Sequence, residues 1–258
     1  MSVSFSDRRF LGLRGGEPAF AAWCGLPEPT IPGLLAREDF DAVALDMQHG
    51  LIDLAAVLRA IPLITASEKP ALVRIPVGEF ATASRLLDAG ASAVIAPMIN
   101  TLEDARRFGS FLKYPPVGER SWGPHAALGV TGLEPAAYFA QANRLTASLA
   151  MIETQAALSI LDDILAEPGI DGVFVGPADL SIALSGGERL DAQSPAVEAA
   201  IDHVLARTRA AGKMAAIYAT TGDRAAGFAR KGFDLVAMAS DAAMLRLGAQ
   251  ASLQAARG

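Results

Sequence analysis

Several short strings that follow apolar runs hold the side chains best suited to chemistry. They are DMQHG at Asp46–Gly50, MIET at Met151–Thr154 and FVGPADLS at Phe174–Ser181. Arg74 ends a fourth apolar run, in ALVRIP. In a protein that alternates strands and helices, the carboxyl ends of the strands converge on one rim, so these residues can share a site. Their types predict a divalent-metal site that holds a small oxyacid.

Two carboxylates are the predicted metal ligands. Glu153 and Asp179 each come just after a predicted strand, and the two strands follow each other in the chain. Carboxylates, water and a chelating substrate give the oxygen coordination that Mg²⁺ and Mn²⁺ prefer, with Co²⁺ as a further possibility. Either residue alone has a second interpretation, because acidic residues often cap the helix that follows a strand. The pair on neighbouring strands favours the metal.

His49 is the predicted proton carrier. It lies three residues after Asp46, whose carboxylate is expected to orient the imidazole ring and support its protonated form, as a general base requires. The other two histidines have different predictions. His203 is expected to be structural or solvated on its helix, and His125 to serve the loop in which it lies.

Arg74 and the GPAD turn are the predicted anion-binding groups. An arginine directly after a buried strand needs a partner, which a substrate oxyanion, a developing enolate oxygen or a carboxylate at the barrel rim would supply. GPAD spans Gly176, Pro177, Ala178 and Asp179 and leads into a helix. The free backbone N–H groups at such a helix start can receive a substrate carboxylate.

The four lysines argue against imine chemistry. Lys69, Lys213 and Lys231 precede predicted strands and so belong to the opposite rim, while Lys113 opens a long loop. None is placed to form a Schiff base with a substrate from within a strand. Stabilisation of a carbanion is therefore assigned to the metal and Arg74.

Alternating strand and helix patterns must position these residues. Strands are expected at 19–23, 42–46, 71–75, 93–97, 148–152, 172–175, 214–218 and 235–238, and helices at 53–66, 81–89, 102–111, 156–166, 195–211, 224–231 and 241–256. This alternation predicts an α/β fold, a parallel (β/α)8 TIM barrel forming one domain over residues 1–258. A doubly wound open sheet is the runner-up, because no Gly-x-Gly-x-x-Gly loop follows a strand. The longest irregular stretch, 114–134, is expected to be a lid, a subunit contact or a surface connection.

Composition excludes several other classes of protein. The 258 residues carry a net charge of −6 with scattered basic residues, which argues against a nucleic-acid partner. No apolar run is long enough to span a bilayer, and the N-terminus lacks a signal-peptide core, so a cytoplasmic protein is expected. The single cysteine, Cys24, excludes an intrachain disulfide and is expected to be a core or rim residue.

Five strings in this order resemble the HpcH/HpaI aldolase family of metal-dependent pyruvate aldolases. They are DMQHG, LVRIP, LDAGASAVIAPMI, IET and FVGPADLS, and they cover nearly the whole chain. The resemblance implies a barrel of the phosphoenolpyruvate/pyruvate-domain type, commonly a homohexamer whose last helix packs on a neighbouring subunit. It implies metal binding by Glu153 and Asp179, proton transfer by His49 with Asp46, and oxygen binding by Arg74. It further implies that Asp88 reaches a neighbour's site.

The resemblance implies a class II aldolase that makes or cleaves 4-hydroxy-2-oxo acids, giving pyruvate or a related 2-oxo acid and an aldehyde. Two departures concern the acceptor: Met151 stands where the family often has glutamine, and the loop reads GERSWG without glycine after its arginine. Two alternatives stay open at this point. One is a lyase of CoA thioesters of the citrate-lyase β type, and the other is a non-catalytic barrel that binds a metabolite.

Overall fold

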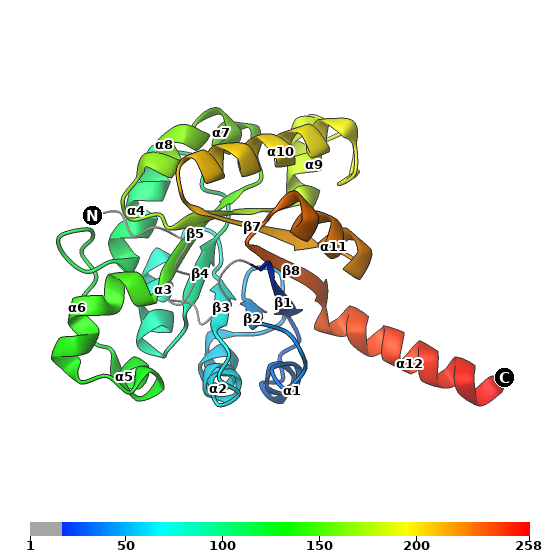
Figure 1. Ribbon diagram of the computed structural model, residues 1–258, viewed down its shortest axis with the longest axis horizontal. Helices are drawn as coiled ribbons and strands as arrows, with labels where there is room; N and C mark the ends of the chain where they lie inside the picture. The colour runs from blue at the N-terminus through cyan, green and yellow to red at the C-terminus, as the bar shows by residue number, and fades with distance from the viewer. Residues whose placement is uncertain (1–16) are drawn as a thin grey trace.

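The strand and helix patterns close into a barrel. The computed structural model describes residues 17–258, and its eight parallel strands pair in chain order, with β8 returning to β1 (Figure 1). The strands are β1 (Ala19–Cys24), β2 (Ala42–Asp46), β3 (Ala71–Arg74), β4 (Ala93–Ala96), β5 (Ala147–Ile152), β6 (Gly172–Val175), β7 (Met214–Ala219) and β8 (Leu235–Ser240). The predicted (β/α)8 barrel is confirmed, and the closed sheet rules out the open doubly wound alternative.

Helices follow the strands and pack on the outside of the barrel. They are α1 (Thr30–Leu35), α2 (Leu54–Thr65), α3 (Phe80–Asp88), α4 (Leu102–Leu112), α5 (His125–Thr131), α6 (Pro135–Leu145), α7 (Gln155–Ser159), α8 (Leu161–Ala166), α9 (Pro177–Leu184), α10 (Pro195–Ala210), α11 (Gly222–Lys231) and α12 (Asp241–Arg257). Side-chain caps stabilise the first turns of some of these helices. Before α2, the Asp53 carboxylate accepts a hydrogen bond from the N–H of Ala56 at 2.7 Å, and before α4, Thr101 forms a capping box with Asp104.

Side-chain alternation along the strands divides the core into two layers. Every second strand residue packs inside the barrel, where alanines from several strands meet a few larger side chains, Trp23, Met151 and Phe174 among them. The intervening residues form a larger cluster with the helices. Because the period is two, a residue two positions after an inward-facing one also faces the barrel axis. The same alternation determines which side chains at the strand ends point toward the barrel axis.

Three predictions about helices need correction. The helix expected at 156–166 is two short helices, α7 and α8, that break at Ile160. The stretch 114–134 was expected to be irregular, but it contains α5, and α6 follows it. Helix α1 was not predicted, and for α9 only the start after GPAD was predicted, because the short strings TIPGLL and PADLSIAL carry proline near their starts and span too few turns for a clear period.

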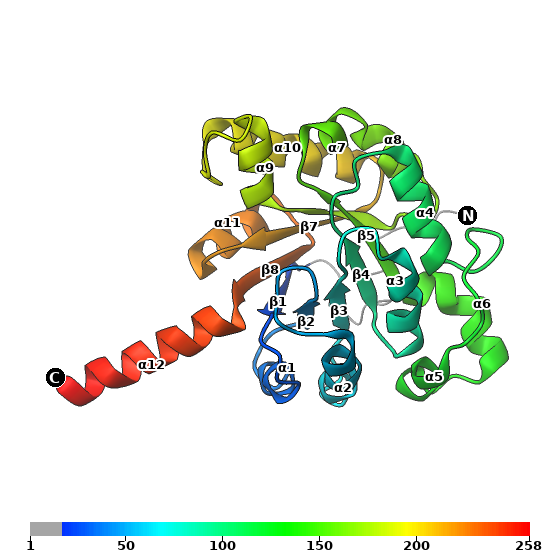
Figure 2. The same ribbon diagram turned by 180° about the vertical axis from the view of Figure 1, so that it is seen from behind.

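Helix α12 leaves the barrel and projects away from it, as both views show (Figures 1 and 2). Three of its leucines, Leu245, Leu247 and Leu253, are each more than half exposed. Among residues 17–258, no helix is long and apolar enough to cross a membrane. A cytoplasmic location stays a prediction, and the expected lack of a signal peptide falls largely on residues 1–16, outside the described part of the chain.

Candidate functional site

A cavity of about 440 Å³ opens where the strands end. Alternation accounts for its polar lining, because Asp46, Arg74 and Gly176 each stand two positions after an inward-facing residue of their strand segment. The structure brings most of the predicted site residues together at its wall. Those that line it are Asp46, His49, Arg74, Gly176, Pro177, Ala178 and Asp179.

A bidentate ion pair forms one wall of the cavity. Asp46 and Arg74 are register partners on β2 and β3. Nε of Arg74 donates to Oδ1 of Asp46 at 2.8 Å, and Nη2 donates to Oδ2 at 2.7 Å. Burial alone would raise the pKa of Asp46, but the hydrogen bonds and charge of Arg74, with backbone N–H donors, lower it. Asp46 is therefore a fixed anion, and the guanidinium is oriented before any ligand arrives.

The expected contact between Asp46 and the imidazole ring of His49 needs correction. Asp46 binds the backbone of this turn instead, because Oδ1 accepts the N–H of Gln48 at 3.0 Å and that of His49 at 3.3 Å. The cross-strand register gives the carboxylate to Arg74. Within residues 17–258 the His49 ring has no hydrogen-bond partner, and the residue is exposed at the cavity wall. Asp46 thus positions the turn that carries His49.

Glu153 follows β5 and lies buried beside the cavity, with 1% of its surface exposed. Its Oε1 accepts the backbone N–H of Met98 at 2.8 Å, whereas Oε2 is buried with no hydrogen-bond partner. Burial raises the pKa of Glu153, the Met98 bond lowers it, and the charge of Asp179 adds to the net rise. A carboxylate oxygen left buried and unpaired is costly unless a cation or proton meets it.

The lack of a side chain at Gly176 leaves room beside Oε2 of Glu153. A Cβ built on Gly176 would lie 2.8 Å from Oε2 of Glu153, so any larger residue would fill this space. Asp179 stands one turn further, in the first turn of α9, where its side chain is exposed. Within residues 17–258 no cluster of three or more His, Cys, Asp or Glu side chains could hold a metal. The donor set therefore fits an ion that completes its shell with water and substrate.

Three aromatic residues of the cavity were not predicted. Trp23 donates its indole N–H to Oδ2 of Asp46 at 3.3 Å, and its ring lies 4.9 Å from the guanidinium carbon of Arg74. Phe174 and Tyr218 pack on either side, with ring centroids 5.7 Å and 5.4 Å from that of Trp23. The alternation of inward-facing residues along β1 and β7 could have identified Trp23 and Tyr218. All three rings line the cavity together with the ion pair.

The β8–α12 junction braces the rim. Asp241 is buried, and its Oδ2 accepts the N–H groups of Gly25 at 3.1 Å and Leu26 at 2.9 Å. The preceding Ala239 has φ +50 where the β1–β8 register shifts beside Trp23. This bulge turns the chain so that Asp241 ties the first turn of α12 to the β1–α1 loop.

Asp88 does not line this chain's cavity. It ends α3, at the opposite end of the barrel, and its Oδ1 accepts from Nη2 of Arg120 at 2.6 Å. Arg120 is buried, and its Nε and Nη1 have no hydrogen-bond partner. A role for Asp88 in catalysis therefore requires a second copy of the chain.

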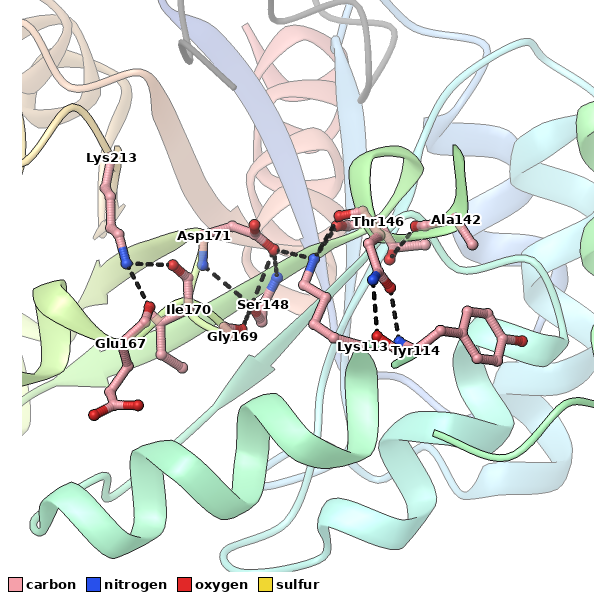
Figure 3. A network of polar contacts seen from close by, with 11 residues as sticks. Lys113, Tyr114, Ala142, Thr146, Ser148, Glu167, Gly169, Ile170, Asp171 and Lys213 are labelled. Atoms are coloured by element: carbon pink, nitrogen blue, oxygen red, sulfur yellow. Dashed lines mark hydrogen bonds and ion pairs between the residues drawn. The ribbon is translucent and has the colours of Figure 1, made fainter. Parts of the chain in front are cut away.

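The lysines lie away from the cavity. Lys113 is buried beneath β5, where it contacts Asp171 at 2.5 Å and donates to the carbonyl of Thr146 (Figure 3). Lys213 donates to the carbonyls of Glu167 and Ile170 in the same region. These amines hold the loops at the amino ends of the strands together. No lysine lines the cavity, which agrees with the prediction that the site does not form an imine.

Cys24 and His203 have the structural or solvated positions predicted for them, whereas His125, expected to serve a loop, begins a helix. Cys24 is buried and free, and burial raises the pKa of its thiol. His125 begins α5 and His203 lies on α10, and both are exposed away from the cavity.

Comparisons with known proteins agree with this geometry. The sequence profile of the family described as HpcH/HpaI aldolase/citrate lyase matches residues 20–247. A hydroxypyruvate/pyruvate aldolase of Rhizorhabdus wittichii is 42% identical over 246 residues, which cover 94% of this chain and 95% of that protein. A 4-hydroxy-2-oxo-heptane-1,7-dioate aldolase of Salmonella dublin is 34% identical, covering 97% and 93%. The crystal structure of an HpcH/HpaI aldolase/citrate lyase family protein from Burkholderia cenocepacia matches with a TM-score of 0.85 at 29% identity, covering 99% and 100%.

Proposed function

Because the chain belongs to the HpcH/HpaI aldolase/citrate lyase family, we propose that it is a class II aldolase acting on 4-hydroxy-2-oxo acids. The enzyme is a carbon–carbon lyase that releases or consumes pyruvate, or a related 2-oxo acid, and an aldehyde. One observation carries the assignment most directly: a paired arginine, an exposed histidine and two carboxylates surround one cavity of small-molecule size. Aldolase-named relatives over most of the chain support it.

The cofactor is a divalent cation, Mg²⁺ or Mn²⁺, held by Glu153 and Asp179. The unpaired Oε2 of Glu153 and the space left by Gly176 support this proposal. A cation bound there would polarise the keto group of the substrate and acidify the carbon next to it. Cobalt fits the same oxygen donors, so the donor set does not select one ion.

The chain's own residues divide the remaining work. The first N–H groups of α9, at Ala178 and Asp179, receive the substrate carboxylate. Arg74, held by Asp46 through Nε and Nη2, presents Nη1 to the keto oxygen, where negative charge develops. His49 accepts the proton of the 4-hydroxyl group as the C3–C4 bond breaks, and the electron pair of that bond forms the enolate. The imidazolium of His49 then returns this proton to C3, which gives the 2-oxo acid, and the aldehyde leaves.

A homo-oligomer completes the proposal. The projecting α12, with its exposed leucines, supports packing of this helix on a neighbouring subunit, and the family resemblance implies a hexamer. In such an assembly Asp88 would contribute to a neighbour's site. Light scattering coupled to size-exclusion chromatography tests the assembly, and truncation after Met244, which keeps Asp241 and removes the exposed leucines, is expected to lower the subunit number.

A coupled cleavage assay tests the function. The protein, stripped of metal by a chelator, is given a racemic 4-hydroxy-2-oxo acid, and released pyruvate is followed through lactate dehydrogenase. Activity that returns with Mg²⁺ or Mn²⁺ and falls at least tenfold in Arg74→Lys is the expected result. Cleavage of a CoA thioester without any pyruvate release would instead identify a thioester lyase. Substrate binding without turnover would identify a metabolite-binding barrel.

A further inference from the structure

The backbone at Met98 adopts an unusual conformation beside the cavity. Its φ is +54°, in the left-handed region that residues with a side chain rarely occupy. Within residues 17–258 only Glu68 and Ala239 share this feature among residues other than glycine. The Met98 side chain is 38% exposed, so burial of the side chain does not account for the conformation.

The left-handed turn directs a backbone donor at Glu153. The N–H of Met98 donates to Oε1 at 2.8 Å, which holds one carboxylate oxygen and leaves Oε2 toward the space in front of Gly176. A second contact braces the same turn, because Oγ1 of Thr154 donates to Oδ1 of Asn100. The β4–α4 turn is thus tied to the segment before α7 by two contacts, one at Glu153 and one at Thr154.

We propose that Met98 is a positioning residue, and that its left-handed backbone orients the Glu153 carboxylate so that Oε2 faces the bound cation. The inference rests on the proposed function, because it assumes that Glu153 holds the metal. A donor fixed behind a ligating carboxylate removes its rotational freedom and sets which oxygen the ion meets. The residue acts through its N–H and its φ angle, and its side chain has no part in this role.

Three substitutions separate backbone from side chain. Met98→Gly keeps the N–H and adopts a positive φ readily, whereas Met98→Val places a β-branched side chain where it is strongly disfavoured. Met98→Leu changes the side chain but not the backbone preference. Glu68→Val is the matched control, because Glu68 has φ +57° and is exposed away from the cavity.

The readout is the dissociation constant for Mn²⁺, measured by electron paramagnetic resonance on the full-length, chelator-stripped protein without substrate. Met98→Gly and Met98→Leu are expected to bind within about threefold of wild type. Met98→Val is expected to bind about tenfold or more weakly, the range seen when partners of metal ligands are removed. Glu68→Val is expected to lower the melting temperature as Met98→Val does, without changing Mn²⁺ binding.

Each other outcome has a definite meaning. Equal affinity of Met98→Val and wild type for Mn²⁺ would overturn the inference. An affinity of Met98→Gly for Mn²⁺ as low as that of Met98→Val would also overturn it, because loss of the methionine side chain would then explain the weaker binding. A wild-type protein that binds no Mn²⁺ would contradict the proposed metal site instead. If Met98→Val does not fold, Met98→Thr supplies the same β-branched conflict with a polar side chain suited to an exposed position.

Discussion

Asp46 and Arg74 face each other across β2 and β3 as register partners and are joined by two parallel hydrogen bonds of 2.8 Å and 2.7 Å. The pair stands at the last position of both strands and points into the barrel. Since Asp46 occupies Nε and Nη2, the arginine can offer Nη1 to a ligand without moving. A rigid cation at the strand ends is what a developing oxyanion requires.

Asp46→Asn is expected to destabilise the protein and to change how its stability depends on pH. Removing one partner of a buried pair leaves Arg74 uncompensated, at a cost of about 3 kcal/mol near neutral pH. The pKa of Asp46 is lowered from its usual 3.8, so its contribution is present above that value and is lost as pH falls through the folded-state pKa. The free energy of unfolding, measured with guanidinium chloride from pH 7 to pH 3, checks both statements.

The difference in the free energy of unfolding between wild type and Asp46→Asn should therefore stay constant down to about pH 5 and become smaller at lower pH. If the difference in the free energy of unfolding widens as pH falls, or stays the same until acid unfolds the protein, Asp46 is not the paired anion described here.

Trp23→Phe is expected to lower kcat about fivefold while leaving KM and the melting temperature nearly unchanged. The substitution keeps the ring against Arg74 but removes the indole N–H that donates to Asp46 at 3.3 Å, worth about 1 kcal/mol for a long bond to a charged group. Steady-state kinetics with the 4-hydroxy-2-oxo acid measure the effect.

Phe174→Leu is the control for Trp23→Phe, because Phe174 packs on Trp23 but makes no polar contact with the ion pair. It should lower the melting temperature, because leucine fills less of the buried space beside Trp23, and it should leave kcat within about twofold, because no polar contact with the ion pair is lost. Equal losses of kcat in the two variants would assign the effect to packing.

Gly176→Ala is expected to weaken Mn²⁺ binding by about 10- to 100-fold, as loss of support around a metal ligand typically does. The new Cβ would lie 2.8 Å from Oε2 of Glu153, in the space proposed for the cation. Gly222→Ala is the matched control, because its Cβ would meet only the Met238 side chain at 3.7 Å. Calorimetric titration of both variants with Mn²⁺ tests this, and unchanged affinity in Gly176→Ala would move the cation elsewhere.

Borohydride treatment in the presence of pyruvate is expected to leave the protein unmodified. The buried amine of Lys113 is bound to Asp171 and backbone carbonyls, Lys213 is held by two carbonyls, and none of the lysines, all within residues 17–258, lines the cavity. Intact-protein mass spectrometry reads the result, with an imine-forming aldolase treated in parallel. The metal-dependent account would be contradicted by a covalent pyruvate adduct on an enzyme that stays active when a chelator removes the metal.

Much of the fold could be predicted because strand and helix periods are local properties of the chain. The strands expected at 42–46 and 172–175 have those bounds in the structure, and the helices expected from 53 and 102 begin directly after the side-chain caps Asp53 and Thr101. Helix α5 was missed because it lies in the Gly- and Pro-rich stretch 114–134, and α6 directly follows that stretch. Both helices pack in a small buried cluster that includes Tyr114 and Tyr138. Contacts of that kind have no local period.

The residues of the site were predicted from their types and their positions at strand ends, but the contacts between them were not predicted. The partner of Asp46 depends on the register between β2 and β3, which assigns its carboxylate to Arg74 and leaves the His49 ring free. The proposed positioning role of Met98 depends on its positive φ angle, and a methionine in the sequence does not indicate such an angle. Trp23 and Tyr218 could have been found, because both continue the inward-facing alternation of their strands.

Hydrogen exchange at the methyl group of pyruvate tests the central claim most directly, because it needs enolate formation but no aldehyde. Chelator-stripped protein is incubated with pyruvate in D₂O and followed by proton NMR before and after addition of Mn²⁺ or Mg²⁺. Loss of the methyl signal only after metal addition, abolished in His49→Ala and retained in lysine-to-alanine variants, is the predicted result. Exchange that proceeds equally without metal, or no exchange with any divalent ion, would contradict the account.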